Sequence, residues 1–386
     1  MNTEDLSTST GESVTGIRYK DISADACDKI LNIARLGSTM GKIGILSTQL
    51  SIVELSNYLL VAGEPMRMQN LLIDRHTLET KRIQSSFCTN WGCDHLLSRC
   101  DTLYYFCGQE KSNENIQLGS VYALNFSTLS KPEELFSMGW RNLSESMSLC
   151  GNKLAYIDAK ALGPCVYNLE TGTPEMLPYD ELPEGIDAIL GVPNGVYFAK
   201  NGSLDCTIYF YDYSLEKLVP ICQASERIAK LCHASADGAL YVIGEKHIGR
   251  LELFSGSRKS DIDPLDVLNA CSLMDSMQSY DDCLLYVAED GSLKMLDYAS
   301  DGIIPLAENA CEHLGFKGGL FSKAQSIVTP SPFSRVGNWV IYNIDGGTEA
   351  YKVSTKEPGY FWPVRVYSRD EMQALEEKIE NVRVSE

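Results

Sequence analysis

The sequence predicts an all-β protein, a seven-bladed β-propeller with a short helix at each end of the chain. Three observations predict it: a strand-turn-strand unit recurs seven times, its spacing suits a propeller blade, and apolar and tyrosine-rich runs dominate it. The stretch Ala234–Asp261 shows the unit clearly, with one apolar run at Leu240–Ile243, a polar turn, a second run at Leu251–Phe254 and a Ser-Gly turn. We therefore expect strands joined by tight turns throughout the repeats.

The first run of each repeat begins with a small or polar residue and carries a tyrosine. These runs are Ser56–Val61, Asp101–Phe106, Asn152–Ile157, Asn194–Ala199, Gly238–Ile243, Asp282–Val287 and Asn338–Asn343. Their tyrosines are Tyr58, Tyr104, Tyr156, Tyr197, Tyr241, Tyr286 and Tyr342. Six intervals separate Tyr58 from Tyr342, which gives a mean period of about 47 residues, close to that of four-stranded propeller blades.

A second run follows in each repeat and ends at a turn rich in Asx, Ser, Thr and Gly. These runs are Leu71–Arg75, Val121–Phe126, Cys165–Leu169, Ile208–Tyr213, Leu251–Phe254, Lys294–Tyr298 and Ala350–Val353. Such residues supply the local hydrogen bonds that turns require. Several repeats continue into a third run, for example Lys217–Ile221 and Ile303–Leu306. Unrelated hairpins in a sandwich, or several small β domains, are the alternative, and the narrow period argues against both.

The repeat resembles loosely defined propellers of the TolB-like kind and bacterial relatives of the low-density-lipoprotein-receptor propellers. In those, a Leu-Tyr-Tyr strand pairs with an Ile-Tyr-x-x-Asp strand that ends at a Thr/Gly turn. Ser235-Ala-Asp-Gly238 is similar to the TolB-like Ser-Pro-Asp-Gly but lacks its proline. The resemblance covers roughly residues 50–365 and implies a fold without an activity.

We predict three parts: a flexible N-terminus with a short helix at 1–42, the propeller at 43–367 and a C-terminal helix at 368–386. Ring closure has two candidates, the segment Ile43–Leu46 joining the last blade or Val364–Tyr367 completing the first. In the tail, Ser368 and Glu371 form a capping-box pattern ahead of an apolar stripe, so this helix either packs on the rim or binds a partner.

Three segments interrupt the repeats. Gln109–Gln117 is a polar insertion in a hairpin, and Asn309–Gln325 reads as a long connection between blades. Ser260–Met277 could hold a short helix, with Asp263 as its cap and Pro264 in its first turn. Insertions on a rigid scaffold are where binding residues tend to lie.

Composition limits the classes of function. Acidic residues outnumber basic ones by 52 to 33, a net charge of −19, so we expect no nucleic-acid partner. The same charge, and the lack of an apolar run long enough to span a bilayer, lead us to expect no membrane association. Met1–Lys20 has no apolar core typical of a secretory signal, so we expect a cytoplasmic protein. The 13 cysteines suit buried thiols in that compartment, among them Cys107, Cys232 and Cys283.

No sequence pattern identifies a catalytic residue, a metal site or a cofactor. The densest cluster is Cys88, Cys93, His95, Cys100 and Cys107, but its spacing lacks the short Cys-x-x-Cys knuckle of zinc sites. The pair Cys232-His233 is adjacent in sequence, and neighbours in a strand point to opposite faces. With His247, His233 is interpreted as an edge residue of the scaffold.

The candidate binding residues are Trp91, Trp140, Arg141 and Trp362, which lie near predicted blade boundaries. Aromatic side chains with arginine suit a protein or sugar surface, although each tryptophan could instead fill space between blades. We favour a non-enzymatic protein-interaction propeller of unknown oligomeric state; the alternative is a hydrolase or lyase acting on a glycan or peptide at the central channel. An enzyme should bring carboxylate, His or Arg side chains from three or more blades together, whereas a binding module should expose an apolar-aromatic patch.

Overall fold

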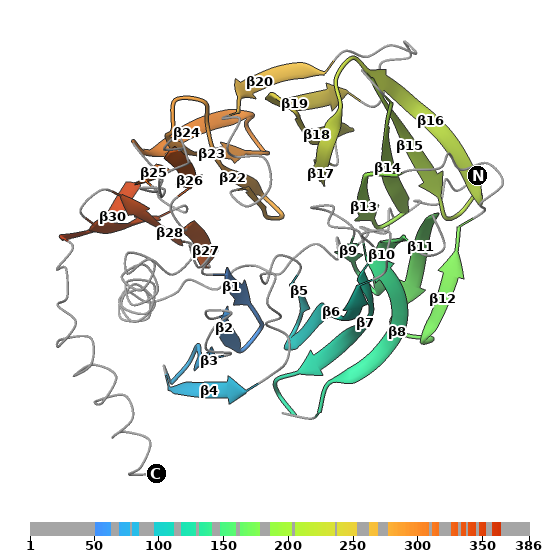
Figure 1. Ribbon diagram of the computed structural model, residues 1–386, viewed down its shortest axis with the longest axis horizontal. Coiled ribbons are helices and arrows are strands. Elements are labelled where there is room, and N and C mark those ends of the chain that lie inside the picture. Colours follow the sequence, from blue (N-terminus) through green and yellow to red (C-terminus); the bar gives the residue numbers. More distant parts are fainter. Residues whose placement is uncertain are drawn as a thin grey trace, which may run out of the picture.

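The computed structural model describes residues 51–363 of the chain, apart from 63–68, 78, 85–95, 112–116, 129–130, 141–146, 160–162, 178–185, 203–204, 236–237, 253–261, 269–276, 309–310, 316–325, 331–332, 337–338, 345–346 and 353–356. Within these residues the chain forms seven four-stranded antiparallel sheets and one two-stranded sheet. The sheets stand side by side in a ring, with the first strand of each toward the centre and the fourth toward the rim (Figure 1). The predicted all-β propeller is confirmed, while both predicted terminal helices lie outside the described residues.

We number the four-stranded sheets 1 to 7 in chain order. Sheet 1 contains β1 (Ser51–Glu54), β2 (Tyr58–Ala62), β3 (Gln69–Asp74) and β4 (Thr80–Gln84). Sheet 2 contains β5 (Leu97–Arg99), β6 (Thr102–Lys111), β7 (Gln117–Asn125) and β8 (Glu133–Trp140). Sheet 3 contains β9 (Met147–Cys150), β10 (Lys153–Asp158), β11 (Gly163–Asn168) and β12 (Thr173–Met176). Sheet 4 contains β13 (Ala188–Val192), β14 (Gly195–Asn201), β15 (Cys206–Asp212) and β16 (Lys217–Ala224).

Sheet 5 contains β17 (Ile228–Ala234), β18 (Ala239–Gly244), β19 (His247–Glu252) and β20 (Asp263–Val267). Sheet 6 contains β21 (Gln278–Ser279), β22 (Cys283–Val287), β23 (Leu293–Asp297) and β24 (Gly302–Ala307). Sheet 7 contains β27 (Phe333–Val336), β28 (Trp339–Ile344), β29 (Gly347–Lys352) and β30 (Glu357–Pro363). The two-stranded sheet, β25 (Cys311–Gly315) and β26 (Ser326–Pro330), falls between sheets 6 and 7 in the chain.

The tyrosine-bearing runs are the second strands of their sheets, not the first. An inner strand of two to seven residues precedes each run, and the second run of each repeat forms the third strand. Second strands such as β18 and β22 are buried along their whole length, because neighbouring sheets cover both of their faces. The outer strand β16 instead mixes buried, intermediate and exposed residues. Continuous apolar runs are therefore easier to find in the sequence than the short inner strands.

The turn that ends the third strand is built by an Asx side chain, as the sequence predicts. In sheet 1 the Asp74 carboxylate accepts hydrogen bonds from the backbone N–H of His76, at 2.8 Å, and of Thr77, at 2.9 Å. The corresponding acceptors in other sheets are Asn125, Asn168, Asp212 and Asp297. This turn lies at the same end of each sheet as the turn between its first two strands, and we call that side of the ring the turn face.

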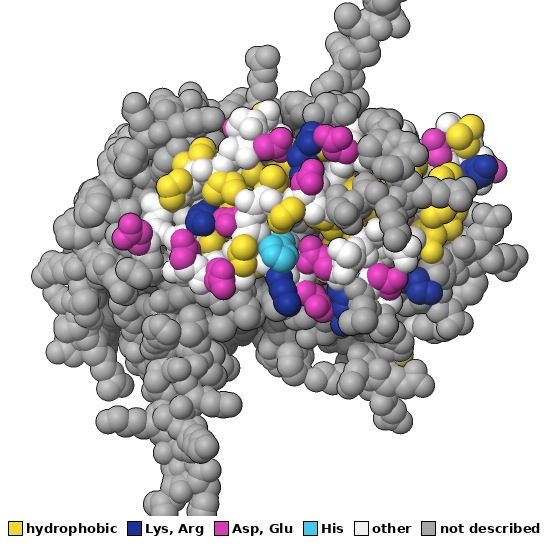
Figure 2. Space-filling view, turned by 90° about the horizontal axis from the view of Figure 1, so that it is seen from above, with side chains coloured by type: hydrophobic (Ala, Val, Ile, Leu, Met, Phe, Trp, Pro, Cys, Tyr) yellow, Lys and Arg dark blue, Asp and Glu magenta, His cyan; other side chains and the backbone are white. Residues whose placement is uncertain are grey.

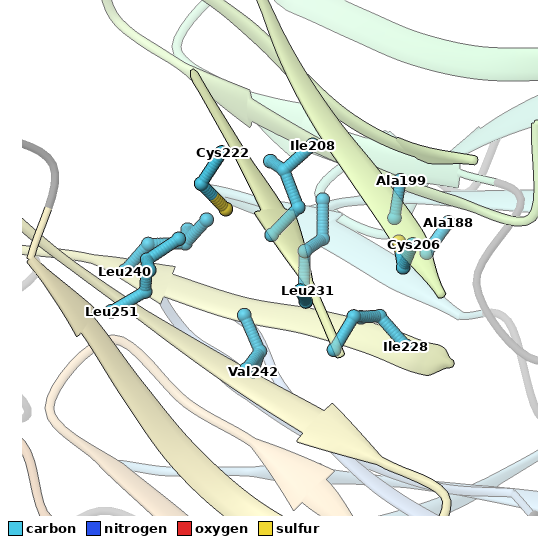
Figure 3. Packing of buried hydrophobic residues seen from close by; sticks show 11 residues of the cluster. Ala188, Ala199, Cys206, Ile208, Cys222, Ile228, Leu231, Leu240, Val242 and Leu251 are labelled. Carbon is cyan, nitrogen blue, oxygen red and sulfur yellow. The ribbon is translucent and has the colours of Figure 1, made fainter. Parts of the chain in front are cut away.

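Buried hydrophobic clusters lie between successive sheets. Between sheets 4 and 5, side chains from both sheets point toward one another, among them Ile208 and Cys222 on one side and Leu240 and Leu251 on the other (Figure 3). Leu240 and Leu251 are fully buried. Similar clusters join the pairs of sheets 1–2, 2–3, 3–4, 5–6 and 6–7. Burial of this kind stabilises each large apolar side chain by about 2 kcal/mol, so sheet-to-sheet packing holds the ring together.

The ring closes by packing of the first sheet on the last. Each of the two sheets is formed by four consecutive strands, and β1 lies against β27. Within the described residues, no strand from one end of the chain completes the sheet at the other end. Both sequence candidates for closure, Ile43–Leu46 and Val364–Tyr367, lie outside the described residues, as do the predicted boundaries of the propeller.

Two of the interrupting segments differ from expectation. The predicted helix within Ser260–Met277 is wrong where it can be compared, because Asp263–Val267 is the strand β20, paired with β19. Backbone hydrogen bonds to a neighbouring edge override the local capping signal. In the predicted connection Asn309–Gln325, Cys311–Gly315 is a strand paired with β26. The hairpin of Gln109–Gln117 extends as β6 and β7, with 112–116 outside the described residues.

Candidate functional site

The inner strands of several sheets end close to the ring axis on the turn face. Cys150 is the last residue of β9, His233 lies near the end of β17, and Arg335 lies near the end of β27. Asp281 and Asp282 form the turn between β21 and β22. We call Cys150, His233, Asp281, Asp282 and Arg335 the axial cluster. The cluster draws on sheets 3, 5, 6 and 7. It therefore brings together carboxylate, His and Arg side chains from three or more sheets, the arrangement that we expected of an enzyme.

Arg335 holds sheet 7 against sheet 6. Its side chain is buried, and its guanidinium forms an ion pair with Asp282 and lies 3.2 Å from the Cys283 sulfur. Its backbone N–H donates a hydrogen bond of 2.8 Å to the Tyr280 hydroxyl. Asp282 remains about half exposed, at 49% of its side-chain surface. The one guanidinium of the cluster is therefore engaged in joining two sheets.

His233 joins sheet 5 to sheet 6 by ring stacking. Its imidazole lies parallel to the Tyr298 ring, with centroids 4.5 Å apart and planes inclined by 5°. The Tyr298 hydroxyl lies 3.0 Å from Ser279 Oγ. The backbone N–H of Tyr298 donates a hydrogen bond of 3.0 Å to the Asp282 carbonyl oxygen. His233 lies on β17, the inner edge strand of its sheet, in line with its interpretation as an edge residue of the scaffold. His247, on β19, is half-exposed, and its Nδ1 lies 3.5 Å from Glu226 Oε2.

Asp281 is the second exposed carboxylate of the axial cluster, beside Asp282. Among the residues that the structure describes, none forms a hydrogen bond or an ion pair with its side chain. Its pKa is raised above the ordinary value, first because surrounding protein removes part of its hydration and second because Asp282 adds a like charge; His233 and Arg335 act in the opposite direction. Asp281 is an exposed residue, so the loss of hydration at its carboxylate is only partial.

The thiols near this site are poorly suited to nucleophilic chemistry. Burial raises the pKa of Cys150, and the charge of Asp281 raises it further. Burial also raises the pKa of Cys283 to about 12. Because the thiolate is the reactive form, neither residue is an activated nucleophile. The prediction that Cys232 and Cys283 are buried is confirmed, and Cys107 is half-buried.

Two expectations about cysteine and metal chemistry need comment. The strict alternation expected at Cys232-His233 does not hold, because the pairing of β17 with β18 shifts by one residue between Leu231 and His233. In the described part of the chain, no three His, Cys, Asp or Glu side chains are grouped to hold a metal ion. Cys88, Cys93 and His95 lie outside that part, so the interpretation of their cluster stays a prediction.

The sequence-predicted binding residues do not belong to the axial cluster. Trp140 ends β8 and Trp362 lies in β30, the outermost strands of sheets 2 and 7. Trp91 and Arg141 lie outside the described residues. Their proposed role in binding stays a prediction. No sequence pattern brought the axial residues together, because they lie in or next to the inner strands of different sheets. The signal that could have found Cys150, Asp281 and Arg335 is their position one to three residues before the second-strand motif.

The rim presents a mixed surface. Figure 2, seen from above the view of Figure 1, shows hydrophobic side chains interspersed with acidic and basic ones. Of the described residues, the large hydrophobic ones that are exposed are Leu215, Val219 and Val267, and none of them is aromatic. The apolar-aromatic patch expected of a binding module is therefore not found in this part of the chain. Over the same residues, no helix is long and apolar enough to cross a membrane.

Comparison with known proteins gives likeness of fold alone. No family model matches the sequence, and no curated protein matches it. Among solved structures, a nidogen–laminin complex is similar with a TM-score of 0.40 and 14% identity, over 66% of this chain and 90% of that one. TolB from Acinetobacter baumannii is similar with a TM-score of 0.36 and 15% identity, over 83% of this chain and 66% of that one.

A third similar structure is Porphyromonas gingivalis dipeptidyl peptidase 4, with a TM-score of 0.44 and 9% identity, over 88% of this chain and 62% of that one. The ring of four-stranded sheets makes the chain a β-propeller, and TolB and a nidogen–laminin complex are among the structures that it resembles. Its sheets themselves, not these likenesses, define the fold. None of the three indicates an activity for this chain.

Proposed function

We propose that this chain is a non-enzymatic protein-interaction propeller that presents a partner-binding surface on the turn face. The axial cluster brings together the residue types expected of an enzyme, but Arg335 and His233 are used to hold the scaffold, and this use supports the proposal. Arg335 pairs with Asp282 to join sheets 6 and 7, and His233 stacks on Tyr298 to join sheets 5 and 6. Groups committed to holding the scaffold make a rigid surface, and a rigid surface loses little entropy on binding.

The same groups are poorly placed for covalent catalysis. A nucleophile needs an adjacent base or a lowered pKa, and the pKa of the Cys150 thiol is raised instead. The net charge of −19 favours a partner with a basic surface and opposes binding to nucleic acid or anionic lipid. We propose a cytoplasmic location, because the buried cysteines among the described residues suit a reducing compartment.

The test is capture of a partner followed by measurement of binding with purified components. The full-length chain is immobilised, a protein retained from extract of the native cell is purified, and calorimetry measures its dissociation constant. We expect saturable binding at fixed stoichiometry, with the partner's mass unchanged after prolonged incubation. A captured protein that is cleaved or modified, or one that shows no saturable binding once purified, would contradict the proposal.

One observation favours the alternative of a hydrolase or lyase acting on a glycan or peptide. Asp281 has a raised pKa, and its carboxylate interacts electrostatically with His233 and Arg335. These three side chains belong to sheets 6, 5 and 7. A carboxyl group with a raised pKa suits general acid–base chemistry. This alternative predicts turnover of peptide or oligosaccharide libraries that Asp281→Asn abolishes; binding without turnover excludes those substrates.

We also propose that the seven four-stranded sheets are the seven blades of one closed ring. Support comes from the packing of β1 on β27 and from the buried clusters between successive sheets. An experimental density map viewed along the ring axis tests this proposal. A gap between the first and last sheets, or a sheet lying outside the ring, would contradict it.

A further inference from the structure

We propose that Asn194 is a modification site, where an intramolecular deamidation converts the side-chain amide into a carboxylate. The reaction favours asparagine followed by glycine, because glycine lacks a side chain that would hinder the approach of its own backbone nitrogen. The sequence holds two such pairs, Asn194-Gly195 and Asn201-Gly202, and they lie at the two ends of β14. The folded structure leaves the first pair open to the reaction and blocks the second. The inference does not depend on the proposed function.

The reaction at Asn194 balances with water as its only co-reactant. The Gly195 backbone nitrogen loses its proton to water and forms a bond to the side-chain carbonyl carbon, Cγ, of Asn194. The bond from Cγ to the amide nitrogen breaks and ammonia leaves, so that a cyclic imide remains. Water then opens the imide at either of its two carbonyls, which gives aspartate or isoaspartate at this position. No group is oxidised or reduced, and the protein gains one negative charge.

The pair Asn194-Gly195 lies at a two-residue turn on the turn face. Pro193 and Asn194 join β13 to β14, and Val192 pairs with Gly195 across the turn. Asn194 is exposed, and among the described residues none forms a hydrogen bond with its side chain. The amide can therefore rotate toward Gly195 without losing a contact. Only this surface turn must open before the nitrogen can attack, and such turns open easily.

Packing of the sheet requires the glycine that makes Asn194 reactive. The backbone of Gly195 lies against β15, where an added Cβ would collide with the Tyr211 carbonyl oxygen and with the Phe210 ring. A larger residue after Asn194 would slow the reaction, but it would also force β14 away from β15. The reactive pair is therefore a consequence of close strand packing.

The pair Asn201-Gly202 is blocked at both of its reacting groups. The Asn201 amide joins sheet 4 to sheet 5, since its nitrogen donates to the Ile228 carbonyl oxygen at 2.8 Å and its oxygen accepts the Ile228 N–H at 2.7 Å. The Gly202 N–H, which holds the attacking nitrogen, donates to the Asp205 carbonyl oxygen at 2.7 Å. Three hydrogen bonds must break before this pair can react. At the usual net strength of a hydrogen bond, we expect Asn201 to react about 100-fold more slowly than Asn194.

The first experiment compares the two pairs within one molecule. The purified full-length chain is incubated at pH 8, and mass spectrometry of its proteolytic peptides follows the conversion of amide to acid at Asn194 and Asn201. In the folded chain, Asn194 should react about 100-fold faster than Asn201. In urea that unfolds the chain, both should react at comparable rates, because only the folded state protects Asn201. Equal rates in the folded chain, or an Asn194 that reacts in the unfolded chain alone, would overturn the inference.

The second experiment follows the charge of the folded chain by ion-exchange chromatography. Wild type should accumulate a species with one additional negative charge, at the rate that mass spectrometry gives for Asn194. Asn194→Ser cannot form the imide and should accumulate none, although it keeps a small polar residue in the exposed turn. If Asn194→Ser gains the charge as fast as wild type, the reacting amide lies elsewhere and the inference fails.

The third experiment identifies isoaspartate by its effect on stability. Isoaspartate adds one carbon to the main chain of the turn, where the Asn194 carbonyl oxygen accepts the Tyr213 N–H at 3.0 Å. Aged protein should therefore unfold at a lower urea concentration than fresh protein. Freshly prepared Asn194→Asp carries the charge without the extra carbon and should unfold with fresh wild type. Aged protein that is as stable as fresh protein would contradict the formation of isoaspartate in this turn.

Discussion

The ion pair between sheets 6 and 7 should respond unequally to removal of its two partners. Asp282→Asn leaves the guanidinium of Arg335, which is 3% exposed, without its carboxylate. A buried charge that loses its partner costs about 3 kcal/mol of unfolding free energy. Arg335→Met leaves Asp282, which is 49% exposed and can regain water, while methionine fills much of the vacated volume. That change should cost about 1 kcal/mol, the net value of one hydrogen bond.

Equilibrium unfolding in urea at pH 7, followed by fluorescence, measures both values. The two variants should differ by about 2 kcal/mol with equal slopes, since a change of slope would report on the denatured state. The double variant should lose no more than Arg335→Met alone. Adding Asp281→Asn to Asp282→Asn shows whether the neighbouring carboxylate takes over the guanidinium.

The surface pair of Arg227 and Glu245 provides a matched control, because its atoms are 3.5 Å apart and its side chains are 48% and 51% exposed. Arg227→Met and Glu245→Gln should each cost less than about 0.5 kcal/mol. If Arg335→Met destabilises the protein as much as Asp282→Asn or more, then burial of the guanidinium does not govern this junction and the reasoning is refuted.

Three further outcomes are expected. Asp101 accepts hydrogen bonds from Asn57 and Ser127; burial acts to raise its pKa, but these bonds outweigh burial and lower it. Asp101→Asn should therefore lower the unfolding free energy by about 1–2 kcal/mol at pH 7. The difference in unfolding free energy between variant and wild type should shrink as pH falls below 3.8, because wild-type Asp101 then becomes protonated. A constant difference in urea titrations would contradict the role given to these hydrogen bonds. Leu240→Ala should cost about 3 kcal/mol in the same titrations, against less than about 0.5 for the exposed Val219→Ala. Gly195→Ala should lower the thermal midpoint, with a cost of about 2 kcal/mol, because its Cβ would lie 2.1 Å from the Tyr211 carbonyl oxygen; an unchanged midpoint would mean that β14 and β15 move apart freely.

The parts of the fold that follow from local chemistry were predictable. The second strands are continuous apolar runs, and the third strands end at Asx turns that a single side chain builds. Both signals lie within a few residues of sequence, so the repeat and its period can be read directly. Inner strands were missed because some are only two to four residues long, as in β21 and β9. So short a strand has no readable period.

Errors arose where distant contacts decided the structure. Asp263 and Pro264 satisfy a helix-start pattern, but β20 forms because the edge of β19 offers hydrogen bonds to that segment. His233 lies on an edge strand as interpreted, but no local pattern shows that this edge is the inner one, where His233 stacks on Tyr298 of the next sheet. The tryptophan candidates were chosen for their residue type, and the two within described strands lie on outermost strands instead.

The sequence by itself determined that the chain is a β-propeller, because a strand repeat cannot bury its faces without neighbours of the same kind. It also determined the turn chemistry and the acidic charge. Only the tertiary structure decided which side chains meet at the ring axis. Cys150 and Arg335 are 185 residues apart, as their numbers show, and contribute to one cluster because the inner strands of sheets 3 and 7 both lie toward the ring axis. That convergence depends on the packing of every sheet between them, which no local pattern encodes.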